Sequence, residues 1–83
     1  MMQVLSLLVE NHQGVLSRIT RLFDGRGYRL ESLASKPTED PDLNRITIVY
    51  DGDHAALEKI EKQLEKLVDV VEVSRLREES VAL

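Results

Sequence analysis

The sequence has 83 residues, a formal net charge of −4 at pH 7, no cysteine and 4% aromatic residues. A chain of this length forms one domain that buries about 60–65% of its unfolded surface, so we expect association with another chain to cover apolar residues. The missing cysteines exclude disulfides and thiolate chemistry, and the acidic, aromatic-poor composition argues against a nucleic-acid partner. No apolar run approaches the roughly 20 residues of a membrane-spanning helix, and no secretory signal is recognisable, so we expect a cytoplasmic protein without a membrane partner.

The first part of the sequence predicts a strand, a glycine-containing loop and a helix. Residues 4–9 are apolar and rich in leucine and valine, as in a mostly buried strand, and the run stops at Asn11. Beyond Gly14, apolar residues fall on one face of a 3.6-residue period and polar residues take the other. The apolar face comprises Val15, Leu16, Ile19, Leu22 and Phe23. Residues 24–27 then supply the glycines that end the helix.

The loop at residues 10–16 is the candidate binding site. Backbone N–H groups in the first turn of a helix lack intrahelical acceptors and carry the positive end of the helix dipole, so they favour a carboxylate or a phosphate. Gly14 has no Cβ and lets such a ligand approach the backbone closely. The residues leave a simpler alternative open, in which Asn11 or Gln13 caps the helix and Gly14 only makes a turn.

The middle of the sequence predicts an edge strand and a second strand joined by a turn. Residues 28–35 alternate imperfectly, with Leu30 and Leu33 on opposite faces, so neither face is fully buried. Residues 37–42 are rich in proline and acidic residues, which indicates a turn. Residues 45–50 alternate cleanly and predict a half-buried strand.

The last part predicts a helix and a fourth strand. Asp53 is the expected N-cap of the helix. Its apolar stripe comprises Leu57, Ile60, Leu64 and Leu67. The strand begins at residues 68–73, and we assign residues 1–77 to the domain and 78–83 to a tail. The order of elements predicts an α+β, ferredoxin-like βαββαβ fold, with a four-stranded antiparallel sheet and two helices on one face.

The sequence offers little for catalysis. His12 and His54 lie in different loops, and the carboxylates of residues 39–42 lack the spacing of a calcium loop. Residues 13–18 resemble the phosphate loop of acylphosphatases, which share this fold, but residues 29–35 lack the asparagine that this family uses to orient water. We therefore expect no catalytic residue, no thiamine diphosphate, no flavin and no metal site.

A second resemblance covers nearly all of residues 3–76. The segments that carry it are NHQGVLSR at 11–18, LF at 22–23, RGY at 26–28, ESL at 31–33, PTEDP at 37–41, RITI at 45–48, IEKQLEKLVDV at 60–70 and VS at 73–74. In this register the chain resembles the ACT domain of acetolactate (acetohydroxyacid) synthase small subunits. The resemblance implies a non-catalytic regulatory subunit that binds the thiamine-diphosphate-dependent catalytic subunit, raises its activity and confers feedback inhibition by valine.

The resemblance also implies a homodimer paired through the second strand, with valine bound between the two chains. The valine carboxylate would take backbone N–H groups of Gly14, Val15 and Leu16, and Asn11 would accept from the ammonium group. Two further effector-binding residues, Arg29 and Leu30, would come from the partner chain by resemblance.

One of these positions departs from the family pattern. The family typically has asparagine where this chain has Arg29, and small apolar residues near Ser35 and Lys36. Arginine could add a charge-assisted hydrogen bond to the effector carboxylate, repel the ammonium group, or point to solvent and leave the pocket unchanged. The alternative function is a free-standing amino-acid-binding ACT module that regulates another protein.

Overall fold

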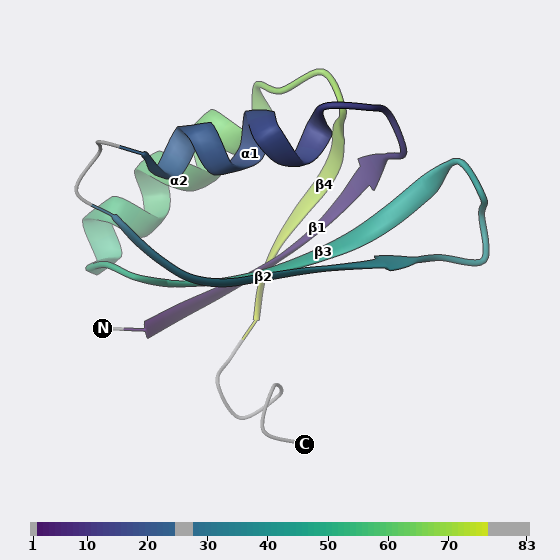
Figure 1. The fold of residues 1–83 in the computed structure, drawn as a ribbon. Coiled ribbons are helices and arrows are strands. Elements are labelled where there is room, and N and C mark those ends of the chain that lie inside the picture. Colours follow the sequence, from purple (N-terminus) through teal and green to yellow (C-terminus); the bar gives the residue numbers. More distant parts are fainter. Residues whose placement is uncertain (1, 25–27, 77–83) are drawn as a thin grey trace.

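The computed structural model describes residues 2–24 and 28–76 (Figure 1). Its elements are β1 (Met2–Glu10), α1 (Val15–Phe23), β2 (Arg29–Pro37), β3 (Leu43–Asp51), α2 (His54–Glu65) and β4 (Val70–Leu76). The strands form one antiparallel sheet in the order β2-β3-β1-β4, and both helices cover the same face of it. This arrangement confirms the expected ferredoxin-like fold. The predicted glycines at 25–27 and the tail at 78–83 lie outside the described residues.

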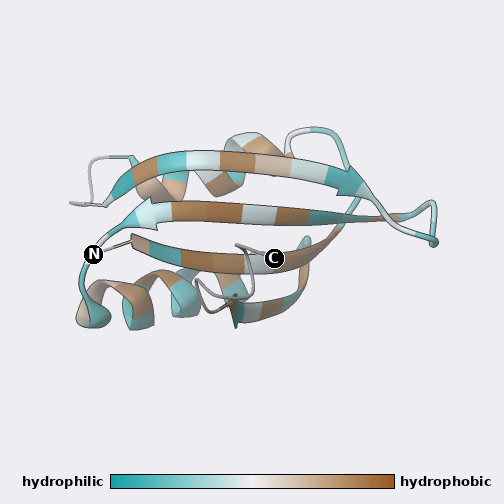
Figure 2. Cartoon of the chain, turned by 90° about the horizontal axis from the view of Figure 1, so that it is seen from below, coloured by the Kyte–Doolittle hydropathy of each residue, from teal (hydrophilic) through white to brown (hydrophobic). Residues whose placement is uncertain are grey.

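The core lies between the helices and the two central strands. Alternate residues of β1 and β3 are fully buried, namely Leu5, Leu7, Ile46, Ile48 and Tyr50. The helices contribute Val15, Ile19, Phe23, Leu57, Ile60 and Leu64. In Figure 2, which views the other face of the sheet, β1 and β3 carry long apolar stretches while the edge strand β2 carries more polar residues. None of the helices in the described ranges is long and apolar enough to cross a membrane.

The strand β2 lies at the edge of the sheet, as expected, but its side chains do not alternate as expected. Leu30 pairs with Tyr50, whereas Ser32 pairs with Val49, so the register shifts by one residue between them. Because this irregularity inserts an extra residue, Leu30 and Leu33 both pack against the core. The prediction that they lie on opposite faces was wrong, since strict alternation cannot anticipate a bulge.

The connection from α2 to β4 also differs from the expectation. The predicted strand start at residue 68 was wrong, because β4 begins at Val70. Val68 is 88% exposed, whereas Asp69 is only 6% exposed. Backbone hydrogen bonds from Leu67 to the Leu64 oxygen and from Val70 to the Leu67 oxygen, both 3.1 Å, fold this segment into a tight turn. The turn places the polar Asp69 inside the molecule.

The two helices begin in different ways. The side chain of Asp53 caps α2, as predicted, by accepting a 2.8 Å hydrogen bond from the N–H of Ala56. The N-cap of α1 is Gly14, with φ 88° and ψ −2°, and no side chain caps that helix. The alternative in which Asn11 or Gln13 caps α1 was therefore wrong. This left-handed conformation is open to glycine at little cost and strained for most other residues.

One polar atom of the core has no partner among the described residues, the hydroxyl oxygen of Tyr50. The ring of Tyr50 packs against Phe23 and Tyr28, with ring centroids 5.4 and 6.3 Å apart. Burial raises the pKa of the Tyr50 phenol far above its usual value, and the nearby carboxylate of Glu61 adds to the shift. The hydroxyl therefore stays neutral in the folded protein.

Candidate functional site

The site lies in the loop between β1 and α1, where the backbone offers free donors. The N–H of Val15 makes a long 3.4 Å hydrogen bond to the His12 oxygen, and the N–H of Arg18 donates to the Gly14 oxygen at 3.1 Å. Between them lie the N–H groups of Leu16 and Ser17, for which the described residues provide no acceptor. Unpaired N–H groups at the positive end of a helix dipole attract an anion. We name this loop, residues 10–17, the cradle.

Four predicted site residues line one small cavity of about 150 Å³: Asn11, Gly14, Val15 and Leu16. Residues outside the predicted site set complete its wall from the neighbouring strands, among them Ser35 on β2 and Asn44 on β3. The amide nitrogen of Asn44 donates a 3.1 Å hydrogen bond to the Asn11 side-chain oxygen. The register of β1 and β3 pairs Val9 with Asn44, so strand pairing was the signal that could have found Asn44.

The cradle is also fastened through its backbone. The N–H of Asn11 donates to the Asp42 oxygen at 2.8 Å, which ties the loop to the turn between β2 and β3. That turn is shaped by Asp40, whose side chain accepts from the N–H of Asp42 at 2.9 Å. The interpretation of the acidic residues as turn-formers is thus confirmed for Asp40.

The remaining predicted site residues, Arg29 and Leu30, lie elsewhere in the same chain. They line a separate cleft of about 610 Å³ near the C-terminal end of α1, together with Phe23 and Tyr28. Arg29 is on the exposed surface, where its Nε lies 3.3 Å from the Glu31 carboxylate. One chain therefore does not bring these residues to the cradle, and their role there stays a prediction that requires a second chain.

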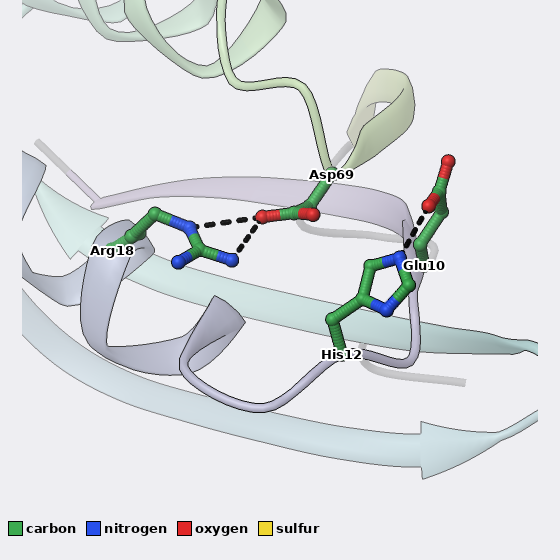
Figure 3. Close-up of polar contacts among 4 residues, drawn as sticks. All are labelled: Glu10, His12, Arg18 and Asp69. Atoms are coloured by element: carbon green, nitrogen blue, oxygen red, sulfur yellow. Dashed lines mark hydrogen bonds and ion pairs between the residues drawn. The ribbon is translucent and has the colours of Figure 1, made fainter.

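An ion pair that the sequence analysis missed joins Arg18 of α1 to Asp69 in the turn before β4, next to the cradle (Figure 3). The guanidinium of Arg18 donates from both Nε, at 2.9 Å, and Nη2 to the Oδ2 atom of Asp69. A Cβ placed on Gly14 would lie 3.5 Å from Nη1 of Arg18. The N–H of Glu10 donates to the backbone oxygen of Asp69 at 2.8 Å. Arg18 and Asp69 are 51 positions apart, so no local sequence pattern could reveal the pair.

This ion pair bears on the acylphosphatase alternative. That hypothesis needs the arginine of the loop, Arg18, to hold a phosphate. In the structure Nε and Nη2 of Arg18 both donate to the buried carboxylate of Asp69. The geometry therefore favours a structural role for Arg18.

The fold defines the class of domain. The chain resembles the ACT domain of GTP pyrophosphokinase from Chlorobium tepidum with a TM-score of 0.74, and the match covers 90% of this chain and 96% of that one. The identity is 14%, so this likeness concerns the fold alone. The element order and the single four-stranded sheet match the fold of that ACT domain.

Closer relatives identify the family. The sequence matches the AHAS small subunit-like ACT domain over residues 5–72. It is 57% identical over 76 residues to the acetolactate synthase isozyme 3 small subunit of Escherichia coli, a match that covers 92% of this chain and 47% of that one. The acetolactate synthase small subunit of Haemophilus influenzae is 53% identical over 79 residues, which cover 95% and 48% of the two chains. The chain belongs to the family of acetolactate synthase small-subunit ACT domains.

A solved structure agrees with this assignment. The acetolactate synthase small subunit from Thermotoga maritima matches with a TM-score of 0.84 and 37% identity, over 94% of this chain and 48% of that one. The chain spans about half the length of the curated relatives it matches. The similarity therefore concerns the ACT-domain half of those proteins.

Proposed function

We propose that this chain is a non-catalytic regulatory component of acetolactate synthase, which binds the thiamine-diphosphate-dependent catalytic subunit, raises its activity and confers feedback inhibition by valine. The observation that carries the proposal is the combination of relatives named acetolactate synthase small subunit, at 53–57% identity, with a cradle of unpaired N–H groups in the matching domain of this chain. The proposal includes a cytoplasmic location. It assigns the chain no cofactor of its own.

The cradle suits the backbone end of an amino acid. The N–H groups at the start of α1 would bind the carboxylate, and the side-chain oxygen of Asn11 would accept from the ammonium group. That oxygen already accepts one hydrogen bond from Asn44, and a carbonyl oxygen has a second lone pair for the ammonium. Asn44 thus supports the proposal by fixing the orientation of Asn11.

The size of the cavity supports a site that two chains share. A volume of about 150 Å³ is below the roughly 300–1,000 Å³ of typical small-molecule pockets. A second chain would add the missing wall. We propose that it does so by pairing edge strand β2 with β2 of the partner, since β2 lies at the end of the sheet with one side unpaired among the described residues.

One register of such a pairing would bring the predicted partner residues to the cradle. Two antiparallel β2 strands related by a two-fold axis between Ser32 and Leu33 would put Leu30 of one chain opposite Ser35 of the other. Ser35 lines the cradle cavity. The same axis would bring Arg29 of the partner beside that cavity, where its cationic group would meet the effector carboxylate.

The experiment is an activity assay of the cognate catalytic subunit alone, with this chain added, and with this chain and valine together. The proposal predicts activation that valine reverses. Activation without a valine effect would retain the partner and remove valine as effector. Valine binding without activation would favour the free-standing ACT module.

A variant of the cradle tests whether the valine response depends on this site, independently of folding. Gly14→Asp places a carboxylate against the proposed effector carboxylate and should abolish the valine response. The matched control is Ala55→Asp, which adds the same charge to the first turn of α2 at an exposed position. An unchanged valine response in folded Gly14→Asp would remove the cradle from the proposal.

A further inference from the structure

Three potential metal ligands meet where the cradle contacts the turn before β4 (Figure 3). Glu10 ends β1, His12 lies in the cradle, and Asp69 lies in the turn before β4. One ligand atom from each lies within 4.8 Å of the others. From this juxtaposition we propose that Glu10, His12 and Asp69 bind a divalent transition metal of the zinc class, a site that the sequence analysis did not expect. Glu10 and His12 alone supply two ligands, and the fold adds the third from a distant segment.

The donor set points to zinc rather than to magnesium or calcium. One imidazole nitrogen and two carboxylate oxygens suit Zn²⁺ and its neighbours in the first transition row, whereas Mg²⁺ and Ca²⁺ prefer oxygen ligands only. The Nε2 atom of His12 and the Oε2 atom of Glu10 are already 2.6 Å apart. A metal would replace the proton between them, and both side chains are about half exposed and can separate slightly to admit it.

Asp69 is the fixed member of the site. It is nine-tenths buried, and both donors of Arg18 bind its Oδ2 atom. The second oxygen of Asp69 lies on the side of Glu10 and His12 (Figure 3). Carboxylates that bind metals are commonly held by a hydrogen bond from a second group. Arg18 provides this restraint here and leaves one oxygen for the metal.

The backbone holds the three ligands in one place. The N–H of Glu10 donates to the Asp69 oxygen at 2.8 Å, and the N–H of His12 donates to the Glu10 oxygen at 2.9 Å. These bonds fix the Cα positions from which the ligands project. A cation therefore needs only side-chain adjustments at Glu10 and His12, which lowers the entropic cost of forming the site.

Charge and access also favour a cation. A cleft of about 530 Å³ is lined by Glu10, His12 and Asp42 among others, so two of the three ligands face it beside a further acidic group. The positive charge of Arg18 opposes a cation, but it is balanced by its own partner, Asp69. Glu10 and Asp42 then supply net negative charge. With three protein ligands, the zinc keeps an open position for water.

The test uses the chain itself and isothermal titration with ZnCl₂ in a buffer that does not bind metals. The proposal predicts one zinc per chain, and about tenfold or greater weakening in His12→Gln and in Glu10→Gln. The matched control is His54→Gln, because the chain has only two histidines and His54 also faces a glutamate, Glu58, at 3.9 Å. Among the described residues that pair has no third ligand beside it, so the control should bind zinc as tightly as the unaltered chain.

A second readout reports the ligand directly. Zinc should shift the imidazole ¹⁵N NMR signals of His12 and leave those of His54 in place. Circular dichroism of each variant confirms that it is folded. Zinc affinity within twofold of the unaltered chain in both His12→Gln and Glu10→Gln, no zinc binding at all, or a shift confined to His54 would each overturn the site.

Discussion

The two helices of this domain begin at opposite extremes of capping. Helix α2 starts at Asp53, whose side chain takes the N–H of Ala56 at 2.8 Å. Helix α1 starts at Gly14, which has no side chain to offer, and the N–H groups of Leu16 and Ser17 have no acceptor among the described residues. A side-chain cap stabilises a helix by about 1 kcal/mol. Its absence at α1 leaves donors free for a ligand.

The surroundings of the two helix starts also differ, because only the start of α1 adjoins a walled cavity among the described residues. Around α1, a cavity is lined by strands β1, β2 and β3 as well as by the helix, and the Arg18–Asp69 pair supports it. Around α2, the cap closes the first turn within the chain itself. The comparison teaches that a helix N-terminus becomes a candidate site only when its cap is missing and neighbouring elements wall it in.

The largest expected effect comes from closing the open helix start. Gly14→Asp should weaken valine binding by about 100-fold, because losing hydrogen bonds to a charged group costs about 1.5–3 kcal/mol. Titration calorimetry of valine into the chain measures this. Ala55→Asp at α2 is the control and should change the affinity less than twofold. Equal losses of valine affinity in both variants would contradict the claim that only the start of α1 is a binding site.

The next effect concerns the ion pair behind the cradle. Arg18→Ala leaves the buried Asp69 carboxylate without its partner, and we expect the free energy of unfolding to fall by about 2 kcal/mol. This is below the 3–5 kcal/mol of a fully buried pair, because the Arg18 side chain is 44% exposed. Urea denaturation gives the value. Arg21→Ala, on the exposed side of the same helix, should stay within about 0.5 kcal/mol.

Removing the cap of α2 should produce a smaller loss of a different kind. Asp53→Ala should lower the free energy of unfolding by about 1 kcal/mol, and valine affinity should not change. Asp53→Asn retains a capping oxygen and should lose less. A drop in valine affinity in Asp53→Ala would show that the two helix starts are not independent.

The smallest effect concerns the backbone strain that a side chain at position 14 would add. Gly14→Asn should cost a few tenths of a kcal/mol, since asparagine tolerates the left-handed region, whereas Gly14→Ala should cost about 1 kcal/mol. Denaturation curves of both variants rank them. Equal stability of the alanine variant and the unaltered chain would mean that the backbone relaxes away from φ 88°.

Much of the fold follows from periodicity alone. The alternation in β3 and the apolar spacing of α1 identified most of the core, because one buried face leaves a regular pattern. Leu16 was wrongly assigned to the apolar face of α1, since it is 44% exposed at the open start of the helix. The bulge at Leu30–Ser32 and the turn before Val70 were not predicted from the sequence. Both insert residues that no period describes, and only pairing with a neighbouring strand reveals them.

The site was predictable only in its local part. The glycine and the helix start are adjacent in sequence, so residues 11–16 could be placed together from pattern and resemblance. Asn44, Ser35 and Asp69 come from other elements. Their positions beside the cradle depend on sheet order and on a partly buried ion pair, neither of which can be seen in a single sequence.

The most direct test of the account follows backbone amide NMR signals of the ¹⁵N-labelled chain during a valine titration. The account predicts saturable shifts at Gly14, Leu16 and Ser17, and no shift at the first turn of α2 around Ala55 and Ala56. Shifts confined to α2, or none at the start of α1 at millimolar valine, would contradict the proposal that the uncapped helix start is the effector site.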